Sequence, residues 1–235
     1  MVILGIETSA VSAGAAVLKD GEIISECYVK NGLTHSQTLM TLIDSALANA
    51  ELKVGDIDYY AVAEGPGSFT GIRIGVSAVK GLSFPDNTPC FGVSTLEALA
   101  YCADEEDCVI CPVMDARCSQ VYTALFRKVN GELERLSPDE PLKLSELSEK
   151  LTAYDEKILL LGDGTKIAFD FLSEKHANIR QFSEIFRFQH ASGVAIAAYG
   201  MYNKGVAPRC GADLQPVYLR LSQAERELKN RSEKK

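Results

Sequence analysis

Short apolar runs separated by turn residues dominate the start of the chain, a pattern typical of β-strands. Val2–Ile6 predicts a strand that ends at Glu7. Two further strands, Ala15–Leu18 and Glu22–Ile24, are joined by Asp20-Gly21, a dipeptide typical of tight hairpins. We therefore expect the chain to open with a three-stranded antiparallel meander.

The same order of elements returns near the middle of the chain. Val109–Met114 predicts a strand that ends at Asp115, and Val121–Phe126 predicts a second strand. The turn Asn130-Gly131 then precedes a third strand at Glu132-Leu133. The two meanders are about half the chain apart, which is too far for a solenoid repeat and indicates two similar lobes.

Helices are predicted after each meander. Between Ser36 and Ala50 the apolar residues recur at intervals of three and four, and we expect this helix to stop near Val54-Gly55. A short strand, Tyr59–Ala63, leads into a second helix that runs to about Ser83. The resulting β-β-β-α-β-α order predicts an α/β fold with mixed sheets flanked by helices. In the second half the predicted elements are a helix at Leu144–Leu151, a strand at Ile158–Leu161, and helices at Ile167–Ser173 and His190–Asn203.

The segment Ala63–Gly75 concentrates four glycines and a proline between the predicted strand and the second helix. Ser68 or Thr70 is the expected N-cap, and the free N–H groups of such a helix start suit an anion. The segment does not match a P-loop or a dinucleotide fingerprint. The alternative is that the glycines only let two backbones pack closely. The candidate nucleotide or phosphate loop comprises Glu7, Thr8, Ser9, Gly65, Gly67 and Ser68.

Gly71 and Gly75 lie four residues apart and therefore share one face of the predicted helix. Ala78 continues this bare stripe and Leu82 closes it. We expect a second element to press closely against the stripe, either a helix of the same chain or a helix of a partner, because the spacing defines the face and not the owner.

Glu7 and Asp115 stand at the ends of the first strands of the two lobes. Ligands of α/β sheets bind at strand ends, so Glu7 is a candidate magnesium-associated or phosphate-associated carboxylate. The alternative is that Glu7 merely caps or buttresses its hairpin, since one carboxylate alone makes a poor site for a hard cation.

Composition narrows the classes of function. The chain has 235 residues, 46% of them hydrophobic, and a net charge of −8, which argues against a strongly basic nucleic-acid binder acting alone. A basic partner could still bring a nucleic acid to it. No apolar run approaches the roughly 20 residues that span a bilayer, and no signal peptide opens the chain, so we expect a cytoplasmic protein without a membrane partner.

The chain offers no legible catalytic centre. His35, His176 and His190 form no i, i+4 pair that could hold a metal, and no Gly-x-Ser-x-Gly motif is present. The seven cysteines are expected to be reduced thiols. Cys108 and Cys111, with Cys102 and Cys118 nearby, resemble a zinc set only superficially because the outer spacings are irregular, and we expect structural thiols.

Six motifs are spread along the chain, namely Ile3–Ser9, His35-Ser-Gln37, Gly65–Arg73, Val93–Leu99, Pro112–Arg117 and Pro216–Arg220. Together they resemble the bacterial TsaB (YeaZ) family. The resemblance spans the chain, is strongest before Arg117, and implies the two-lobed actin/Hsp70/sugar-kinase (ASKHA) fold. With the pattern above, it predicts an N-terminal lobe of residues 1–103, a C-terminal lobe of residues 104–221 and a charged tail of residues 222–235.

The resemblance also implies a function, namely a non-catalytic subunit in the formation of N6-threonylcarbamoyladenosine at position 37 of tRNAs reading ANN codons. Its implied partners are the catalytic paralogue TsaD, whose His-x3-His metal pair this sequence lacks, the ATPase TsaE, tRNA through the complex, and a second copy of the chain when alone. It implies no cofactor for this chain, with ATP or ADP and Mg²⁺ as candidates in the complex. Cys118 stands where a basic residue is expected, which leaves the role of its hairpin open.

Family members pair through the helices of the first lobe, so the resemblance places the partner or dimer interface on the two helices Ser36–Ala50 and Thr70–Ser83. The rival reading is an enzyme of the same superfamily, either a nucleotide-binding hydrolase or kinase or a glycoprotease. The predicted interface residues are His35, Ser36, Leu39, Met40, Ile43, Leu47, Gly71, Ile72, Gly75, Ala78, Val79 and Leu82.

Overall fold

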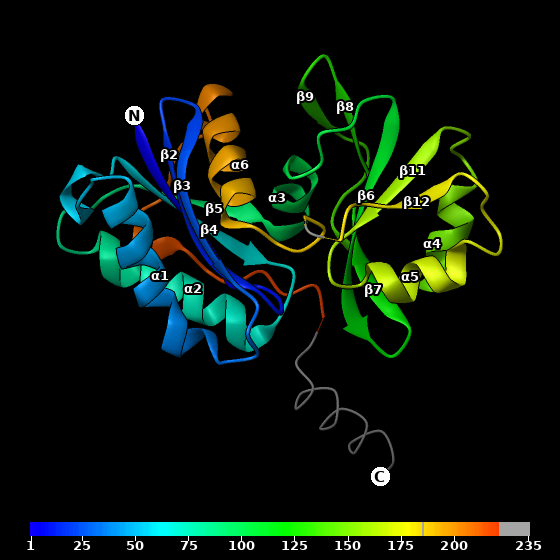
Figure 1. The fold of residues 1–235 in the computed structure, drawn as a ribbon, viewed down its shortest axis with the longest axis horizontal. Coiled ribbons are helices and arrows are strands. Elements are labelled where there is room, and N and C mark those ends of the chain that lie inside the picture. Colours follow the sequence, from blue (N-terminus) through cyan, green and yellow to red (C-terminus); the bar gives the residue numbers. More distant parts are fainter. Residues whose placement is uncertain (185, 221–235) are drawn as a thin grey trace, which may run out of the picture.

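The computed structural model describes residues 1–184 and 186–220 and contains two lobes, each built on one β-sheet (Figure 1). The first sheet has the strand order β3-β2-β1-β4-β5. Its first three strands form the predicted meander, with Asp20 at φ 52° and Gly21 at φ 93° in the hairpin turn, and β4 and β5 are parallel to β1. The strands are β1 (Val2–Glu7), β2 (Ala13–Lys19), β3 (Glu22–Val29), β4 (Tyr59–Gly65) and β5 (Cys90–Ser94).

The second sheet is centred on a long strand, β6, which pairs with β11 in parallel and with β7 and β8 in antiparallel fashion. The predicted single strand Val121–Phe126 is wrong, because it is divided between β7 and β8. These strands pair with different halves of β6, and the backbone N–H of Leu125 between them donates to Ser137 Oγ (2.9 Å). The strands are β6 (Cys108–Arg117), β7 (Gln120–Thr123), β8 (Phe126–Val129), β9 (Glu132–Arg135), β10 (Glu140–Lys143), β11 (Lys157–Leu161) and β12 (Ile179–Gln181).

Helices cover both faces of the first sheet. α1 and α2 lie on one face, and α6 lies on the other with α3 beside it (Figure 1). α1 ends at Asn49, before the predicted stop at Val54-Gly55. Glu51, which follows the helix, adopts φ 56°, and Val54–Asp56 form a separate 3-10 turn. The helices are α1 (His35–Asn49), α2 (Phe69–Ser83), α3 (Thr95–Tyr101), α4 (Leu144–Leu151), α5 (Thr165–Leu172) and α6 (Ala191–Asn203).

The last described part of the chain returns to the first lobe, so the predicted C-terminal lobe of residues 104–221 is wrong at its end. Val194 and Ala195 of α6 are buried against Ile3 of β1. Downstream, Arg209 pairs with Cys90 through two backbone hydrogen bonds of 2.8 Å. We call residues 209–220 the C-terminal segment; the predicted tail, residues 222–235, lies outside the described residues.

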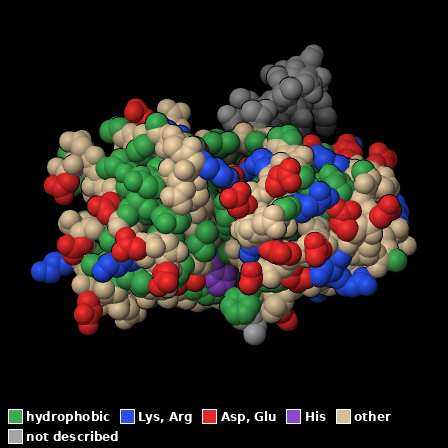
Figure 2. Space-filling model, turned by 90° about the horizontal axis from the view of Figure 1, so that it is seen from above, with side chains coloured by type: hydrophobic (Ala, Val, Ile, Leu, Met, Phe, Trp, Pro, Cys, Tyr) green, Lys and Arg blue, Asp and Glu red, His purple; other side chains and the backbone are tan. Residues whose placement is uncertain are grey.

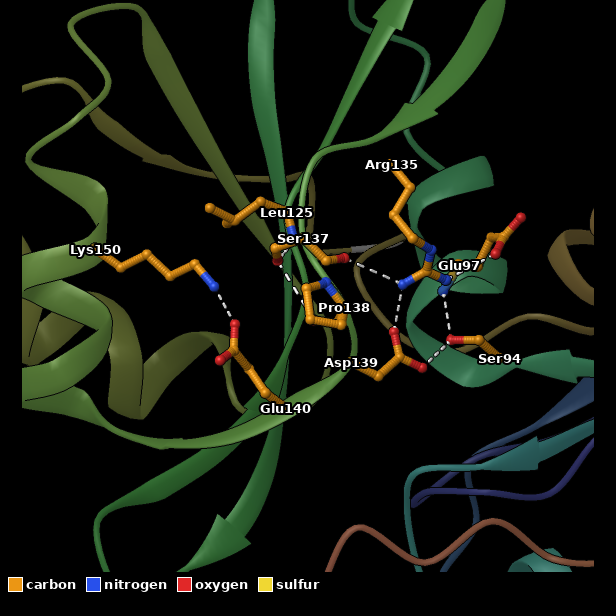
Figure 3. Close-up of polar contacts among 9 residues, drawn as sticks. All are labelled: Ser94, Glu97, Leu125, Arg135, Ser137, Pro138, Asp139, Glu140 and Lys150. Atoms are coloured by element: carbon orange, nitrogen blue, oxygen red, sulfur yellow. Dashed lines mark hydrogen bonds and ion pairs between the residues drawn. The ribbon is translucent and has the colours of Figure 1, made fainter.

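α3 joins the two lobes. Its residues Leu96 and Leu99 pack into the core that covers one face of the second sheet, while Ala98 packs against α6. A polar network adds to this contact (Figure 3): Ser94 Oγ accepts from the N–H of Glu97 at the start of α3 and donates to Asp139 Oδ2 (2.5 Å). Arg135 then bonds both Asp139 Oδ1 (2.5 Å) and Glu97 Oε2 (2.7 Å), which ties the β9–β10 connection to the first lobe.

The surface differs between the lobes. Figure 2 shows hydrophobic side chains gathered over the first lobe, on the left, whereas acidic and basic side chains are interspersed over the second. Within the described residues, no helix combines the length and the apolar character needed to cross a bilayer.

Candidate docking groove and interlobe cleft

A groove of about 470 Å³ runs between α1 and the first half of α2. Met40, which is 47% exposed, contributes to its apolar lining, and Arg73 contributes a charge. A mostly apolar surface with a polar rim is the arrangement that protein partners bury. The lining residues are Ser36, Leu39, Met40, Thr70, Arg73, Ile74, Ser77 and Ala78.

The residues of the predicted interface divide between the groove and the core of the first lobe. Ser36, Met40 and Ala78 line the groove, and His35 is half-buried with its ring Nε2 2.7 Å from the carbonyl oxygen of Ala10. Leu39 lines the floor of the groove although it is almost fully buried, and Leu82 packs on the core edge. The residues that are buried in the chain's own core, and so are not a free surface, are Ile43, Leu47, Gly71, Ile72, Gly75 and Val79.

Sequence reasoning missed four residues of the groove, Thr70, Arg73, Ile74 and Ser77. They lie on the face of α2 opposite the glycines, at the helical spacing that places them in one outward row. Assigning the glycine stripe to the interior would have identified this row from the periodicity alone.

The two glycines of the α2 stripe face the turn after β1. A Cβ at Gly71 would overlap the carbonyl oxygen of Thr8, and one at Gly75 would come within 2.5 Å of Thr8 Oγ1. Gly67 approaches the carbonyl oxygen of Ser9 in the same way. The alternative reading, in which the glycines let two backbones pack closely, is therefore confirmed, and the element that presses on them is the turn after β1.

The loop around Glu7 does not suit a phosphate. Glu7 is fully buried, and burial raises its pKa to about 7, although the hydrogen bond from the Ser9 N–H to Oε1 opposes this shift. The nearby Asp163 carboxylate raises the pKa further, whereas His190 lowers it. Within the described residues Oε2 of Glu7 has no hydrogen-bond partner. An uncompensated carboxylate at this position repels an anion.

Glu7 and Asp115 have the same local role in the two lobes. Each carboxylate accepts a hydrogen bond from the backbone N–H two residues further on, Ser9 and Arg117 respectively. This is the capping role that the alternative reading assigned to Glu7. Among residues 1–184 and 186–220, no group of three or more His, Cys, Asp or Glu side chains is arranged so that it could hold a metal ion.

A cleft of about 510 Å³ separates the lobes next to the start of α2. Ser9, Ser68 and Thr70 line it from the first lobe, and Asp115 and Asp163 line it from the second. Burial raises the pKa of Asp163, while the hydrogen bond that Gln189 Nε2 donates to its Oδ1 (3.1 Å) opposes the shift. Oγ of Ser9 is buried without a partner in the described part of the chain.

The cysteines near the second meander do not converge. Cys108 and Cys111 both belong to β6, but Cys108 packs into the core toward α3 and Cys111 into the core under α4 and α5, on opposite faces of the sheet. Burial raises the pKa of Cys111 to about 12. Cys118 is exposed in the β6–β7 turn, where it adopts φ 55°. These thiols cannot share one metal ion.

Comparison with known proteins identifies this architecture as an α/β fold of the actin-like ASKHA class. The structure covers 99% of a Pseudomonas aeruginosa chain described as an uncharacterized protein with similarity to peptidase YEAZ, at TM-score 0.78 and 23% identity over 93% of this chain. It also covers 98% of the (R)-2-hydroxyglutaryl-CoA dehydratase component A of Acidaminococcus fermentans, at TM-score 0.52, 14% identity and 87% of this chain. At these identities the likeness shows the fold alone.

The sequence relatives define the family. Residues 31–227 match the model of the family described as TsaD, tRNA N6-adenosine threonylcarbamoyltransferase. The chain is 35% identical to the tRNA threonylcarbamoyladenosine biosynthesis protein TsaB of Bacillus subtilis over 96% of both chains, and 27% identical to that of Escherichia coli over 97% of this chain and 98% of the other. It is also 32% identical to the B. subtilis tRNA N6-adenosine threonylcarbamoyltransferase, over 57% of this chain and 44% of that protein. The chain belongs to the TsaB (YeaZ) family of tRNA threonylcarbamoyladenosine biosynthesis proteins.

Proposed function

We propose that this chain is a non-catalytic subunit that docks a TsaD-type threonylcarbamoyltransferase through the α1–α2 groove. The complex would form N6-threonylcarbamoyladenosine at position 37 of tRNAs reading ANN codons, with a TsaE-type ATPase as third component. The observation that carries the proposal is the groove itself, in which Met40 and Ile74 offer apolar area on two adjoining helices. Exposed apolar grooves with polar rims are typical of partner surfaces.

The site chemistry favours a supporting role over the rival hydrolase, kinase or glycoprotease. Turnover by this chain would need an activated nucleophile or a bound metal. Glu7 already accepts a hydrogen bond from the Ser9 N–H, and the glycines of the adjacent loop are packed against Thr8 and Ser9. We propose that any ATP or ADP with Mg²⁺ binds elsewhere in the complex.

Reconstitution tests the proposal. The modification would be measured with purified TsaC-type synthase, TsaD-type and TsaE-type proteins and tRNA, with and without this chain. Met40→Glu places a charge in the groove and is expected to abolish association with the TsaD-type protein in sedimentation and to lower modification by the same factor. Ile167→Glu is the matched control, because Ile167 is 45% exposed on α5 of the other lobe. Equal loss in both variants, or none in either, would contradict the assignment of the groove.

The same groove is proposed to pair two copies of the chain when the partner is absent. A two-fold dimer uses one patch twice, so a single substitution changes both sides of the interface. Sedimentation of the isolated chain is expected to show a dimer that Met40→Glu converts to a monomer. A dimer that survives this substitution would place self-association on another surface.

A further inference from the structure

Half of the arginines in the described part of the chain lack an acidic partner there. Arg127, Arg135, Arg187 and Arg209 form ion pairs with carboxylates. Within residues 1–184 and 186–220, Arg73, Arg117, Arg180 and Arg220 form none. In a chain whose net charge is −8, cations that remain uncompensated are informative about what the surface binds.

Three of these four arginines are connected through the C-terminal segment, and one of them, Arg117, lines the interlobe cleft. Arg73 of α2 donates from Nε to the hydroxyl of Tyr218 in the C-terminal segment (2.7 Å). Two residues later, Arg220 donates from Nη1 to the carbonyl oxygen of Ala116 (2.5 Å), beside Arg117. We call Arg73, Arg117 and Arg220 the arginine strip; its residues belong to α2, the end of β6 and the C-terminal segment.

An aromatic pair lies within the strip. Tyr218, which is 37% exposed, stacks on Phe69 at the first position of α2, with ring centroids 4.3 Å apart and an interplanar angle of 13°. The guanidinium of Arg73 also lies 5.6 Å from the Tyr218 ring centroid. Exposed aromatic faces beside guanidinium groups are the combination on which unpaired bases stack while arginines bind the phosphates.

Within the described residues the carboxylates at the cleft form no ion pair with the strip. Asp115 uses Oδ1 to accept from the backbone N–H of Arg117, and Asp163 uses Oδ1 to accept from Gln189 Nε2. The turn itself is strained, because Arg117, Cys118 and Ser119 adopt φ 63°, 55° and 56°, a left-handed conformation that non-glycine residues rarely take. The fold thus presents Arg117 at the cleft mouth at an energetic cost.

We propose that the arginine strip, with the Phe69–Tyr218 pair, binds single-stranded RNA, the guanidinium groups contacting phosphates and Tyr218 stacking on a base. Arg73 also lines the α1–α2 groove, so the RNA would pass along the edge of a docked partner. The choice of RNA as the bound polyanion rests on the proposed function in tRNA modification.

Binding of a labelled anticodon stem-loop RNA to the full chain, measured by fluorescence anisotropy over a range of salt concentrations, tests the proposal. Arg117→Glu is the main variant because its side chain is exposed at the surface of the hairpin turn. It is expected to lower affinity about tenfold and to reduce the salt slope by about 0.7, the change that accompanies removal of one phosphate contact. Arg180→Glu is the matched control, an exposed arginine on β12 that bonds only backbone carbonyls. It is expected to leave affinity and slope unchanged.

The proposal is overturned if the wild-type chain shows no salt-dependent RNA binding, or if the two variants weaken binding equally. Sedimentation with the TsaD-type partner supplies a second readout. Weaker docking by Arg117→Glu at unchanged RNA affinity would make the strip a protein-binding surface and would also overturn the proposal. If reconstituted modification depends on the chain while Arg117→Glu leaves the RNA affinity unchanged, only the RNA-binding proposal fails. Modification that is independent of the chain contradicts the proposed function instead.

Discussion

Replacing Glu7 by Gln should make the protein more stable at neutral and alkaline pH. The carboxyl is fully buried, and its pKa is raised to about 7 from the ordinary value of 4.5, with burial as the largest cause. Gln keeps the oxygen that accepts from the Ser9 N–H and cannot ionise. The substitution therefore removes the cost of a buried charge with little change of shape.

The sign follows from proton linkage. Between the two pKa values the folded chain holds a proton on Glu7 that the unfolded chain has released, so the free energy of unfolding of the wild type falls as pH rises through this window. Above the folded pKa the loss is complete, and the difference between 4.5 and about 7 corresponds to about 3 kcal/mol. Below the unfolded pKa the wild type and the variant should be alike.

Urea unfolding followed by circular dichroism at about pH 5 and about pH 8 measures this difference, provided that the transition is two-state. Glu134→Gln controls for the loss of a charge, because Glu134 is exposed on β9. The reasoning is refuted if the advantage of Glu7→Gln is the same at both pH values. A variant that is less stable than the wild type at the higher pH would mean that the fold stabilises ionised Glu7 more than burial destabilises it.

Three further outcomes are expected. Gly75→Leu should lower the free energy of unfolding by several kcal/mol and prevent folding, because even a Cβ at this position would lie 2.5 Å from Thr8 Oγ1. A variant with wild-type circular dichroism and intact docking would contradict the assignment of Gly75 to the interior. Arg135→Ala should lower the free energy of unfolding by about 1–3 kcal/mol. The loss should exceed that of Arg127→Ala, because the ion pair of Arg127 with Glu156 lies within the second lobe. Equal losses of the two variants in denaturant unfolding would contradict the interlobe role of the network. Metal analysis of protein purified without added metal should find no stoichiometric zinc, since Cys108 and Cys111 lie on opposite faces of β6, and zinc released by a thiol-blocking reagent would show this to be wrong.

Local signals predicted most elements of both lobes and missed features that depend on distant pairing. α2 begins after Ser68 and ends at Ser83 as expected, because an N-cap hydroxyl and a helical period are local properties. The division between β7 and β8 left no trace in the pattern. Ala124 and Phe126 face one core and Leu125 the other, so the apolar alternation continues through the residues where the chain changes partner.

The place of α6 could not be predicted from its own residues. The helix is rich in alanine and small residues, which predict close packing without naming the partner. Its contact partners are also small: Gly14 lies opposite Ala191, and a Cβ at Gly5 would come within 2.9 Å of the Ala195 methyl group. The small residues that pack together therefore belong to β1, β2 and a helix that lies far away in sequence. A pattern that is analysed along the chain does not show that these elements are in contact.

The glycines of the candidate phosphate loop serve the architecture of a lobe. In each lobe a strand parallel to the first strand, β4 beside β1 and β11 beside β6, ends in a glycine-rich turn. In the first lobe Gly67 and Gly71 meet the turn after Glu7, and in the second a Cβ at Gly164 would come within 2.9 Å of the N–H nitrogen of Asp115.

The glycines and the strand-end carboxylate thus recur together, because two turns can cross at this distance only where one of them lacks a Cβ. The missing side chains of Gly67 and Gly71 are thereby accounted for by the close approach of Ser9 and Thr8, with no ligand required. The row on α2 that faces away from the glycines, Thr70, Arg73, Ile74 and Ser77, is consequently the part of the motif left free to meet another molecule.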